Sequence, residues 1–370
     1  MRAGLYVHFP FCRAKCPYCH FYSVPWDEAA FRVWREGLER EAEASAAAGL
    51  SCDTLYVGGG TPSLIEPGDL ARLRDLLQAR FDLRPEEFTL EADPGAGGAA
   101  LMRGWREAGV TRLSVGVQSF DDEVLRTLER PHSADKAMRF CRSAREAGFG
   151  SLSIDVMTGI PGEAPGSVER TLAETLRLEP DHVSLYFLEN VEGLPFEDTL
   201  RRHPVDEDTA VDAYERARAS LEEAGLRRYE ISNFAREGKE CRHNLKYWRY
   251  EPFIGLGPSA CSHAGERRWC NKASLQGWAE ALARGESARE DVVELTPERA
   301  AREALAAGLR LVEGVDLAAL KLRFGVDIGN VHSREIGELA AEGLLVMTGG
   351  RLRIPADRLL VANAILSRIV

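Results

Sequence analysis

The chain has 370 residues, 45% of them hydrophobic and 28% charged, which is ordinary for a globular protein. Its formal net charge of −11 argues against nonspecific binding to nucleic acids, and no basic, aromatic-rich segment argues for it. No run of about 18 apolar residues and no signal peptide is visible, and the eight cysteines show no paired framework, so we expect a protein of the reducing cytoplasm.

Up to about residue 190 the pattern alternates between apolar strands and helices. The strand candidates are 4–9, 53–58, 87–92, 111–117, 151–157 and 181–187. The helix candidates between them are 27–48, 67–80, 98–108, 133–148 and 166–177. Six such units, with polar motifs at the strand ends, predict an α/β fold with a partial (β/α)6 barrel. At about 150 residues per domain, the length allows two or three domains.

Three cysteines follow the first strand candidate: Cys12, Cys16 and Cys19, in a C-x3-C-x2-C spacing. Three thiolates on one loop can hold three corners of a [4Fe–4S] cluster and leave the fourth iron open for another ligand. Zinc is an alternative, because it also binds cysteines at such spacings, although it usually takes four protein ligands. A disulfide would leave one cysteine of the triplet unpaired. The triplet by itself therefore favours an iron–sulfur cluster without excluding zinc.

The second strand candidate runs directly into the segment Gly58-Gly59-Gly60-Thr61-Pro62. Glycines at the carboxyl end of a strand let the backbone approach a ligand closely, because no Cβ intervenes. Ligands of α/β folds bind at the carboxyl ends of parallel strands. Taken alone, however, this segment is better explained as a turn.

Polar side chains also end or interrupt the later apolar runs. Glu91, Gln118 and Asp155 occupy such positions, and a carboxylate there is poorly solvated unless it binds something. Arg130 could pair with the carboxylate of a ligand or form an internal ion pair, and Asp93 could cap a helix. These residues are candidates for one ligand site at the strand ends.

In this order the motifs resemble those of radical S-adenosylmethionine (SAM) proteins. Over nearly the whole chain they are similar to the oxygen-independent coproporphyrinogen III oxidases and the related HemW-type heme chaperones. The resemblance implies a [4Fe–4S] cluster on Cys12, Cys16 and Cys19, reduced by a donor such as a flavodoxin or ferredoxin. It implies SAM contacts from Tyr6, Gly59, Gly60, Thr61, Glu91, Gln118, Arg130 and Asp155.

Two features distinguish the branches of this family. Its oxidases carry a fourth cysteine where this chain has Phe21, and a long extension before the cluster, whereas the first cysteine here is already Cys12. The chaperones also share an HNxxYW motif, which this chain has at 243–248. The resemblance implies heme binding by His243, Tyr247 and Trp248, since imidazole ligates heme iron and aromatic rings offer a flat apolar wall. The alternative is a polar turn that begins a helix over a core Tyr/Trp pair.

One position departs from the chaperone pattern. Cys261 stands where a histidine usually follows Ser-Ala, and His263 comes two residues later. Heme ligation through a thiolate is one interpretation, but a buried and inert Cys261 fits better. No function is predicted for Cys52, Cys141 or Cys270.

A helix at 206–224 and a strand at 227–231 follow the barrel, and the composition changes at 284–296. Beyond that change, helices at 297–311, 316–323 and 332–342 and strands at 344–348 and 351–354 resemble a winged-helix module. Such modules often bind DNA, but in this family the resemblance implies a lid or docking surface. The predicted domains are a radical SAM core (1–235, with the cluster loop at 11–22), an extension closing the site (236–290) and a C-terminal domain (291–370).

Together these observations predict a cytoplasmic heme chaperone that binds a [4Fe–4S] cluster and SAM. It would pass heme to an apo-hemoprotein acceptor, for example a respiratory, membrane-associated one, and would not bind nucleic acid. The alternative is an enzyme, the oxidase that converts two propionates of coproporphyrinogen to vinyl groups, so no catalytic residue is assigned. A zinc-stabilised binding module is a third possibility, but it leaves Tyr6 and Glu91 unexplained.

Overall fold

The main body of the molecule is one curved, twelve-stranded sheet, seen in a computed structural model that describes residues 2–46 and 49–369. The strands follow the order β14-β13-β12-β11-β1-β4-β5-β6-β7-β8-β10-β9. The central strands are β1 (Ala3–Phe9), β4 (Ser51–Gly59), β5 (Asp82–Ala92), β6 (Arg112–Gln118), β7 (Ser151–Thr158) and β8 (His182–Phe187). Each pairs in parallel with the next, so the predicted partial (β/α)6 barrel is confirmed.

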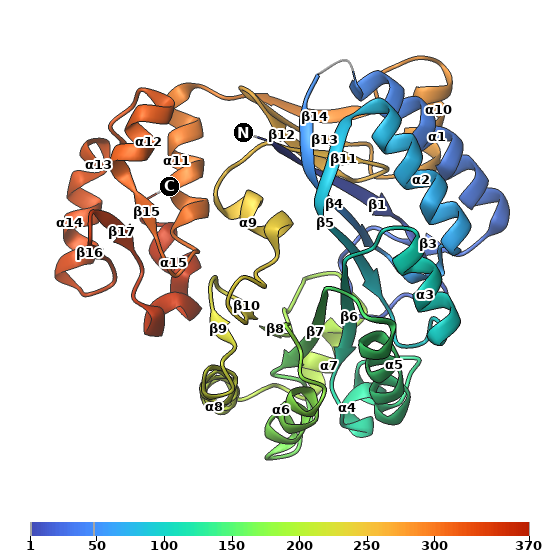
Figure 1. The fold of residues 1–370 in the computed structure, drawn as a ribbon. Helices are drawn as coiled ribbons and strands as arrows, with labels where there is room; N and C mark the ends of the chain where they lie inside the picture. Colours follow the sequence, from blue (N-terminus) through green and yellow to red (C-terminus); the bar gives the residue numbers. More distant parts are fainter. Residues whose placement is uncertain (1, 47–48, 370) are drawn as a thin grey trace.

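Helices from the first half of the chain cover the outer face of this sheet (Figure 1). They are α1 (Glu28–Ala46), α2 (Pro67–Arg80), α3 (Ala99–Glu107), α4 (Asp122–Thr127), α5 (Ala134–Ala147) and α6 (Ser167–Arg177). The short α4 was not predicted, and the predicted end of the first helix, at 47–48, lies outside the described residues. In α5, Ala137, Phe140, Cys141 and Ala144 form the buried stripe of an amphipathic helix. Ser133 caps this helix, and Gly148 ends it in the left-handed conformation (φ 74°).

The two faces of the sheet differ in chemistry because side chains alternate along each strand. Leu5 pairs with Leu55 in the register of β1 and β4, and both are fully buried. The next pair, Tyr6 and Tyr56, lies on the opposite, concave face, where both rings approach His243 of α9 (Arg242–Trp248). The outer face therefore forms the core under the helices, and the concave face carries polar side chains.

Several strands that the sequence did not predict extend the sheet at its edges. Beyond β1 come β11 (Phe253–Leu256), β12 (Cys261–Ala264), β13 (Arg267–Asn271) and β14 (Arg289–Glu294), with α10 (Leu275–Ala283) packed on α1. Beyond β8, after α7 (Glu197–Arg202) and α8 (Glu207–Glu223), come β10 (Asn233–Ala235) and β9 (Arg227–Arg228). The predicted strand at 227–231 is thus confined to its first two residues. The main sheet continues to Glu294.

A buried carboxylate joins α1 to this extension. Glu41 accepts hydrogen bonds from the Gly257 N–H (2.7 Å), the Asn271 side-chain amide (2.5 Å) and the Trp278 indole (3.2 Å). Burial raises the pKa of Glu41 to about 7. Three donors from separate segments converge on one side chain, so Glu41 fixes the extension against the barrel.

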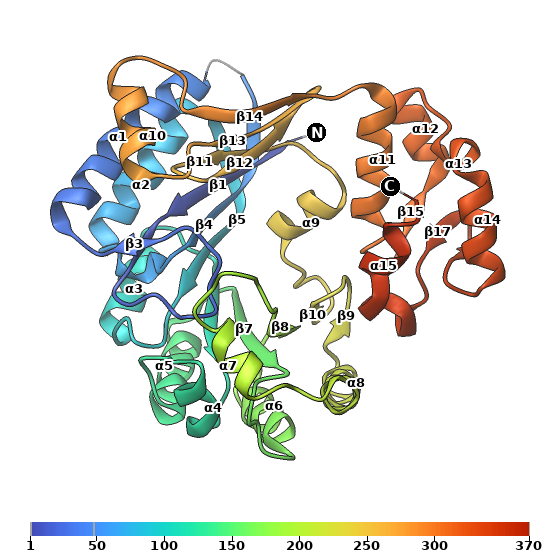
Figure 2. The same cartoon turned by 180° about the vertical axis from the view of Figure 1, so that it is seen from behind.

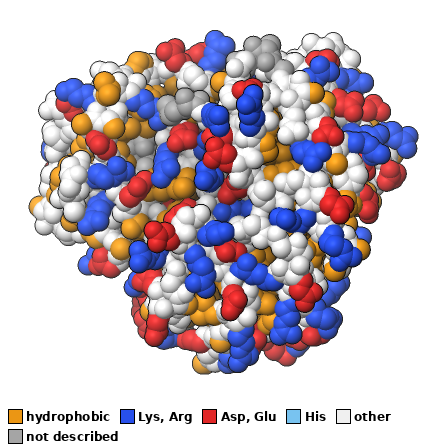
Figure 3. Space-filling model, viewed as in Figure 1, with side chains coloured by type: hydrophobic (Ala, Val, Ile, Leu, Met, Phe, Trp, Pro, Cys, Tyr) orange, Lys and Arg blue, Asp and Glu red, His pale blue; other side chains and the backbone are white. Residues whose placement is uncertain are grey.

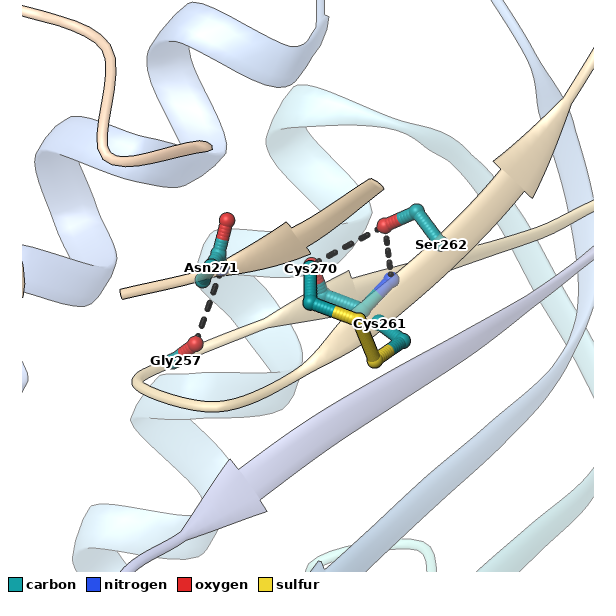
Figure 4. The surroundings of a disulfide bond; sticks show 6 residues. Gly257, Cys261, Ser262, Cys270 and Asn271 are labelled. Atoms are coloured by element: carbon teal, nitrogen blue, oxygen red, sulfur yellow. Dashed lines mark hydrogen bonds between the residues drawn. A yellow bond between two sulfur atoms is a disulfide. The ribbon is translucent and has the colours of Figure 1, made fainter. Parts of the chain in front are cut away.

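The expectation that Cys261 is buried and inert is wrong. Cys261 is exposed and forms a disulfide with Cys270 (Figure 4). The two residues lie directly opposite each other on the antiparallel strands β12 and β13, a position that brings two side chains close enough to bond. The expectation that no cysteines are paired is wrong for the same reason, and Cys261 is not a free thiolate.

The C-terminal part forms a separate small core beside the open side of the barrel (Figure 2). Its elements are α11 (Pro297–Gly308), β15 (Val315–Asp316), α12 (Leu317–Phe324), α13 (Ile328–Val331), α14 (Ser333–Ala341), β16 (Val346–Thr348), β17 (Arg351–Arg353), η2 (Ala356–Val361) and α15 (Ala362–Leu366). The strands make a small sheet in the order β15-β17-β16. This arrangement of helices followed by a hairpin confirms the predicted winged-helix-like module.

The visible surface is mixed in charge. In Figure 3, Lys and Arg side chains lie among Asp and Glu side chains over the whole face shown. Within the described residues, none of the helices combines the length and the apolar character needed to cross a membrane.

Candidate functional site

The predicted cluster cysteines lie on a loop that begins in β2 (Phe11–Cys12) and returns to β3 (Val24–Pro25), its parallel partner. All three cysteines are free thiols. The Thr61 hydroxyl donates to the Cys12 sulfur (3.4 Å), and the Arg130 guanidinium donates to the Cys16 sulfur (3.4 Å). Burial raises the pKa of Cys19. The loop therefore presents three sulfur atoms, two of them supported by side chains from distant segments.

One cavity of about 410 Å³ collects these cysteines and most of the predicted SAM residues. It lies at the carboxyl ends of the parallel strands, as the motif positions predicted. Besides the three cysteines, its wall includes Gly59, Gly60, Thr61, Glu91, Gln118, Arg130 and Asp155. We call this space the cluster cavity. Tyr6 is the one predicted SAM residue that does not line it.

Glu91 is held by its neighbours at the end of β5. Its carboxylate accepts hydrogen bonds from the Tyr56 hydroxyl (2.7 Å) and the Gly59 N–H (3.0 Å). Burial raises the pKa of Glu91 to about 7, against the effect of these two donors. The carboxyl group is therefore partly protonated near neutral pH, and a further donor would favour its ionised form.

The triple glycine is required by close packing within the protein itself. A Cβ on Gly60 would lie 2.6 Å from the Phe11 carbonyl oxygen, and one on Gly59 would lie 2.6 Å from the His8 ring. Gly59 also has a φ of 116°, which residues with a side chain rarely adopt. The glycines thus let the cluster loop pack directly on the end of β4, and this brings Thr61 to the Cys12 sulfur.

Gln118 has a strained backbone at the end of β6. Its φ is 67°, uncommon outside glycine, and the strand register shifts between Val115 and Gln118. The Gln118 side-chain oxygen accepts a hydrogen bond from the Tyr186 hydroxyl (2.7 Å). Tyr186 also lines the cluster cavity and was not predicted, although it stands near the end of the sixth strand, the kind of position that identified the other residues.

Asp155 lies on the same wall, where the Ser114 hydroxyl donates to it (3.3 Å). Burial raises the pKa of Asp155 to about 6. Ser114 is a second cavity residue that the sequence did not indicate, because a serine inside an apolar strand has no distinctive pattern.

Arg130 forms the internal ion pair that the sequence left open. Its guanidinium lies 2.6 Å from the Asp93 carboxylate and donates to the Gly116 carbonyl (2.8 Å) as well as to the Cys16 sulfur. Its Nε has no partner among the described residues. Asp93 thus positions Arg130 beside the cluster loop, where the guanidinium can still bind an additional anion.

The HNxxYW residues lie elsewhere. His243 is fully buried between α9 and the strands β1 and β4, and both of its ring nitrogens have partners. Nδ1 lies 2.8 Å from the Thr54 hydroxyl, and Nε2 lies 2.8 Å from the Tyr247 hydroxyl. Burial lowers the pKa of His243 to about 3, so the ring is neutral. The packed imidazole would have to leave one partner before it could ligate a metal.

Trp248 contacts a different part of the molecule from His243 and Tyr247, namely the C-terminal module. The Arg310 guanidinium of the C-terminal module lies 5.9 Å from its ring centroid. None of the three residues lines the cluster cavity or the cavity of about 520 Å³ that adjoins it. Their predicted part in heme binding stays a prediction.

The residues of the cluster cavity fit a [4Fe–4S] cluster better than one metal ion. Within the described residues, no group of three or more His, Cys, Asp or Glu side chains is arranged to hold a metal ion. A structural zinc site needs four ligands converging on one point, whereas a cubane cluster takes each cysteine on its own iron. Three free thiols on one loop, with an adjoining cavity for a further ligand, match the requirement of a cubane cluster.

Comparison with known proteins adds independent information. The model of the radical SAM superfamily matches residues 6–174, and that of the HemN C-terminal domain matches residues 295–357. The heme chaperone HemW of Mycobacterium tuberculosis is 34% identical over an alignment of 376 residues, which covers 99% of this chain and 94% of the relative. The heme chaperone HemW of Bacillus subtilis is 31% identical over 352 residues, with 92% of each chain covered.

A solved structure shows the same architecture. Coproporphyrinogen III oxidase (HemN) of Escherichia coli, a radical SAM enzyme, superposes with a TM-score of 0.85, covering 100% of this chain and 90% of that one. Its sequence identity of 23% makes this a likeness of fold.

Proposed function

Because this chain belongs to the HemW family of the radical SAM superfamily, we propose that it is a heme chaperone that binds a [4Fe–4S] cluster and SAM. In this proposal it carries heme in the cytoplasm and transfers it to an acceptor hemoprotein. The observation that carries the proposal is the cluster cavity, where three free thiols meet the polar ends of β4 to β7.

The chain's own residues have distinct parts in this site. Cys12, Cys16 and Cys19 would hold the cluster, which together with SAM supplies one-electron reductive chemistry when bound. Glu91 and Asp155, two partly buried acids with raised pKa values, would accept hydrogen bonds from ribose hydroxyls or an ammonium group. Each would then be stabilised in its ionised form.

Two further residues would position the cofactors rather than react. Arg130 keeps a positive charge beside the Cys16 sulfur and could hold a carboxylate with its unpartnered Nε. Tyr6 does not line the cavity, but its hydroxyl lies 3.0 Å from His8 Nδ1, and in this role it would support β1, the strand that precedes the cluster loop.

The HNxxYW residues would act in heme binding through the position of α9. His243 and Tyr247 fix this helix against β1 and β4, and the same segment presents Cys241 and Asn244 to a cavity of the barrel. Trp248 fixes the other side of α9 against the C-terminal module. Loss of His243 should therefore weaken heme binding even without a bond to iron.

The test is an anaerobic assay of the reconstituted protein in two parts. In the first, the protein is incubated with SAM, a strong reductant and coproporphyrinogen, beside an active oxidase as control. In the second, it is titrated with heme and then mixed with an apo-hemoprotein. The proposal predicts no protoporphyrinogen, stoichiometric heme binding and transfer of that heme. Protoporphyrinogen formed over many turnovers would overturn it in favour of the oxidase.

A further inference from the structure

A second cavity adjoins the cluster cavity inside the barrel. Its volume is about 520 Å³, within the range of sites that enclose small ligands. The two cavities share wall residues, namely Tyr18, Cys19, Phe21, Ser114, Asp155 and Tyr186. The C-terminal module contributes Leu359 and Leu360 to the far wall. We call this space the inner cavity.

The inner cavity is lined mainly by apolar and aromatic side chains. Among them are Met157, Leu185, Phe187, Tyr214 and Ile231. Such a lining suits a flat, largely apolar molecule, which gains affinity from the surface it removes from water.

The polar part of the lining includes unsatisfied buried groups. Arg112 donates through Nε to Glu87 (2.8 Å) and through Nη2 to the carbonyl oxygens of Lys239 and Glu240 (2.8 and 3.0 Å). Its Nη1 is buried and has no partner in the part of the chain that the structure describes, and the same is true of the Thr89 hydroxyl. Buried donors without acceptors are costly, so this pair is suited to the carboxylate of a ligand.

A histidine of the cluster loop lines the same cavity. His20 lines the inner cavity and not the cluster cavity, whereas its neighbours Cys19 and Phe21 line both. The ring is exposed and has no hydrogen bond to any described residue. It lies against Phe21 (centroids 4.6 Å apart), whose side chain is 55% exposed. An exposed aromatic pair at the wall of a cavity is a surface on which a flat ligand can stack.

The other histidine in this lining is not available in the same way. His182 Nδ1 lies 2.7 Å from the Ser153 hydroxyl, and its Nε2 lies 2.9 Å from the Tyr229 hydroxyl. His243 is equally saturated and lies outside the cavity. His20 therefore has a ring nitrogen free for a metal, beside a cavity of suitable size and chemistry.

We propose that the inner cavity is the heme site, where His20 would ligate the heme iron and Arg112 would pair with a propionate. This inference rests on the proposed chaperone function and deepens it by placing the cargo. It assigns the iron ligand to the cluster loop rather than to the HNxxYW motif, so cargo and cluster share the short segment between Tyr18 and Phe21.

The test compares ferric heme titrations of the cluster-containing wild type, His20→Ala, His20→Met and the surface control His203→Ala, followed by absorption and electron paramagnetic resonance. His20→Ala should bind heme about tenfold more weakly or worse and lose the imidazole-type spectrum, and added imidazole should restore that spectrum. His20→Met should give a thioether-type spectrum. Iron and sulfide are measured in every variant to show that the cluster is intact.

The carboxylate contact is tested on the wild-type protein alone, with heme dimethyl ester as the ligand. Loss of a charge-assisted hydrogen bond should weaken binding about tenfold or more. Equal affinity for heme and its ester overturns the assignment of Arg112, and an unchanged heme spectrum in both His20 variants overturns that of His20. If the wild type binds no heme at all, the proposed function itself fails.

Discussion

The cluster cavity and helix α9 both carry motif residues, but they differ in what those residues contact. In the cavity, the three cysteines are free thiols, and Glu91 and Asp155 lie at an open wall. In α9, His243 and Tyr247 bond to each other, His243 also bonds to Thr54 of β4, and neither residue lines the cluster cavity or the inner cavity. A motif therefore marks important positions in both regions. Motif side chains that line a cavity can bind a ligand, whereas those whose polar atoms are all paired within the protein stabilise the fold.

The largest effect should come from the cavity. Cys16→Ala removes one of three thiolates on the cluster loop, so we expect complete loss of the cluster's visible absorbance and of bound iron and sulfide, with an unchanged circular dichroism spectrum. Cys261→Ser, which changes a cysteine that lines neither cavity, is the control and should keep the cluster. Unchanged iron and sulfide in Cys16→Ala would contradict the assignment of the cavity.

In α9 the expected effect is on stability. His243→Ala leaves a cavity and deprives the buried hydroxyls of Thr54 and Tyr247 of their partner. We expect the free energy of unfolding to fall by about 2–5 kcal/mol, measured by denaturant titration. His203→Ala, at an exposed position after α7, should change it little. Equal stability of both variants would show that His243 is not a packing residue.

A pH experiment extends the comparison to Glu91. The folded-state pKa of about 7 lies above the ordinary value of 4.5, so the folded protein holds this proton more tightly than the unfolded chain. Glu91 therefore costs stability as the pH rises from about 4.5 to about 7, by about 3 kcal/mol at most. In cofactor-free protein, the difference in unfolding free energy between pH 5 and pH 8 should be smaller in Glu91→Gln. An equal difference in both proteins would show that the pKa of Glu91 is not raised in the folded protein.

The smallest effect on stability should come from the disulfide, which lies outside both the cluster cavity and α9. Reducing the Cys261–Cys270 bond, which closes a loop with a sequence separation of 9, should lower the free energy of unfolding by about 2 kcal/mol or less. Cluster content and heme affinity should not change, because neither cysteine lines a described cavity. Loss of the cluster on mild reduction would show that this hairpin and the cluster cavity are not independent of each other.

The central part of the fold and the cavity could be predicted because their signals are local. Each central strand is an apolar run, and parallel strands end on one side of the sheet, which brings Glu91 and Asp155 together. The pairing of both His243 ring nitrogens within the protein could not be predicted, since one partner, Thr54, lies 189 positions away in the sequence. The bond from Cys261 to Cys270 depends on the register of a hairpin whose short strands carry no periodic signal.

The strands that finish the main sheet have a consequence for association between molecules. A central parallel strand such as β6, if left at an edge, would offer an apolar template to another chain. Instead, the outermost strands are β9, which has only two residues and an exposed Arg227, and β14, whose residues Arg289, Glu290 and Asp291 are exposed. Charged edge strands discourage further pairing, so the extension that completes the sheet also protects the chain from edge-to-edge aggregation.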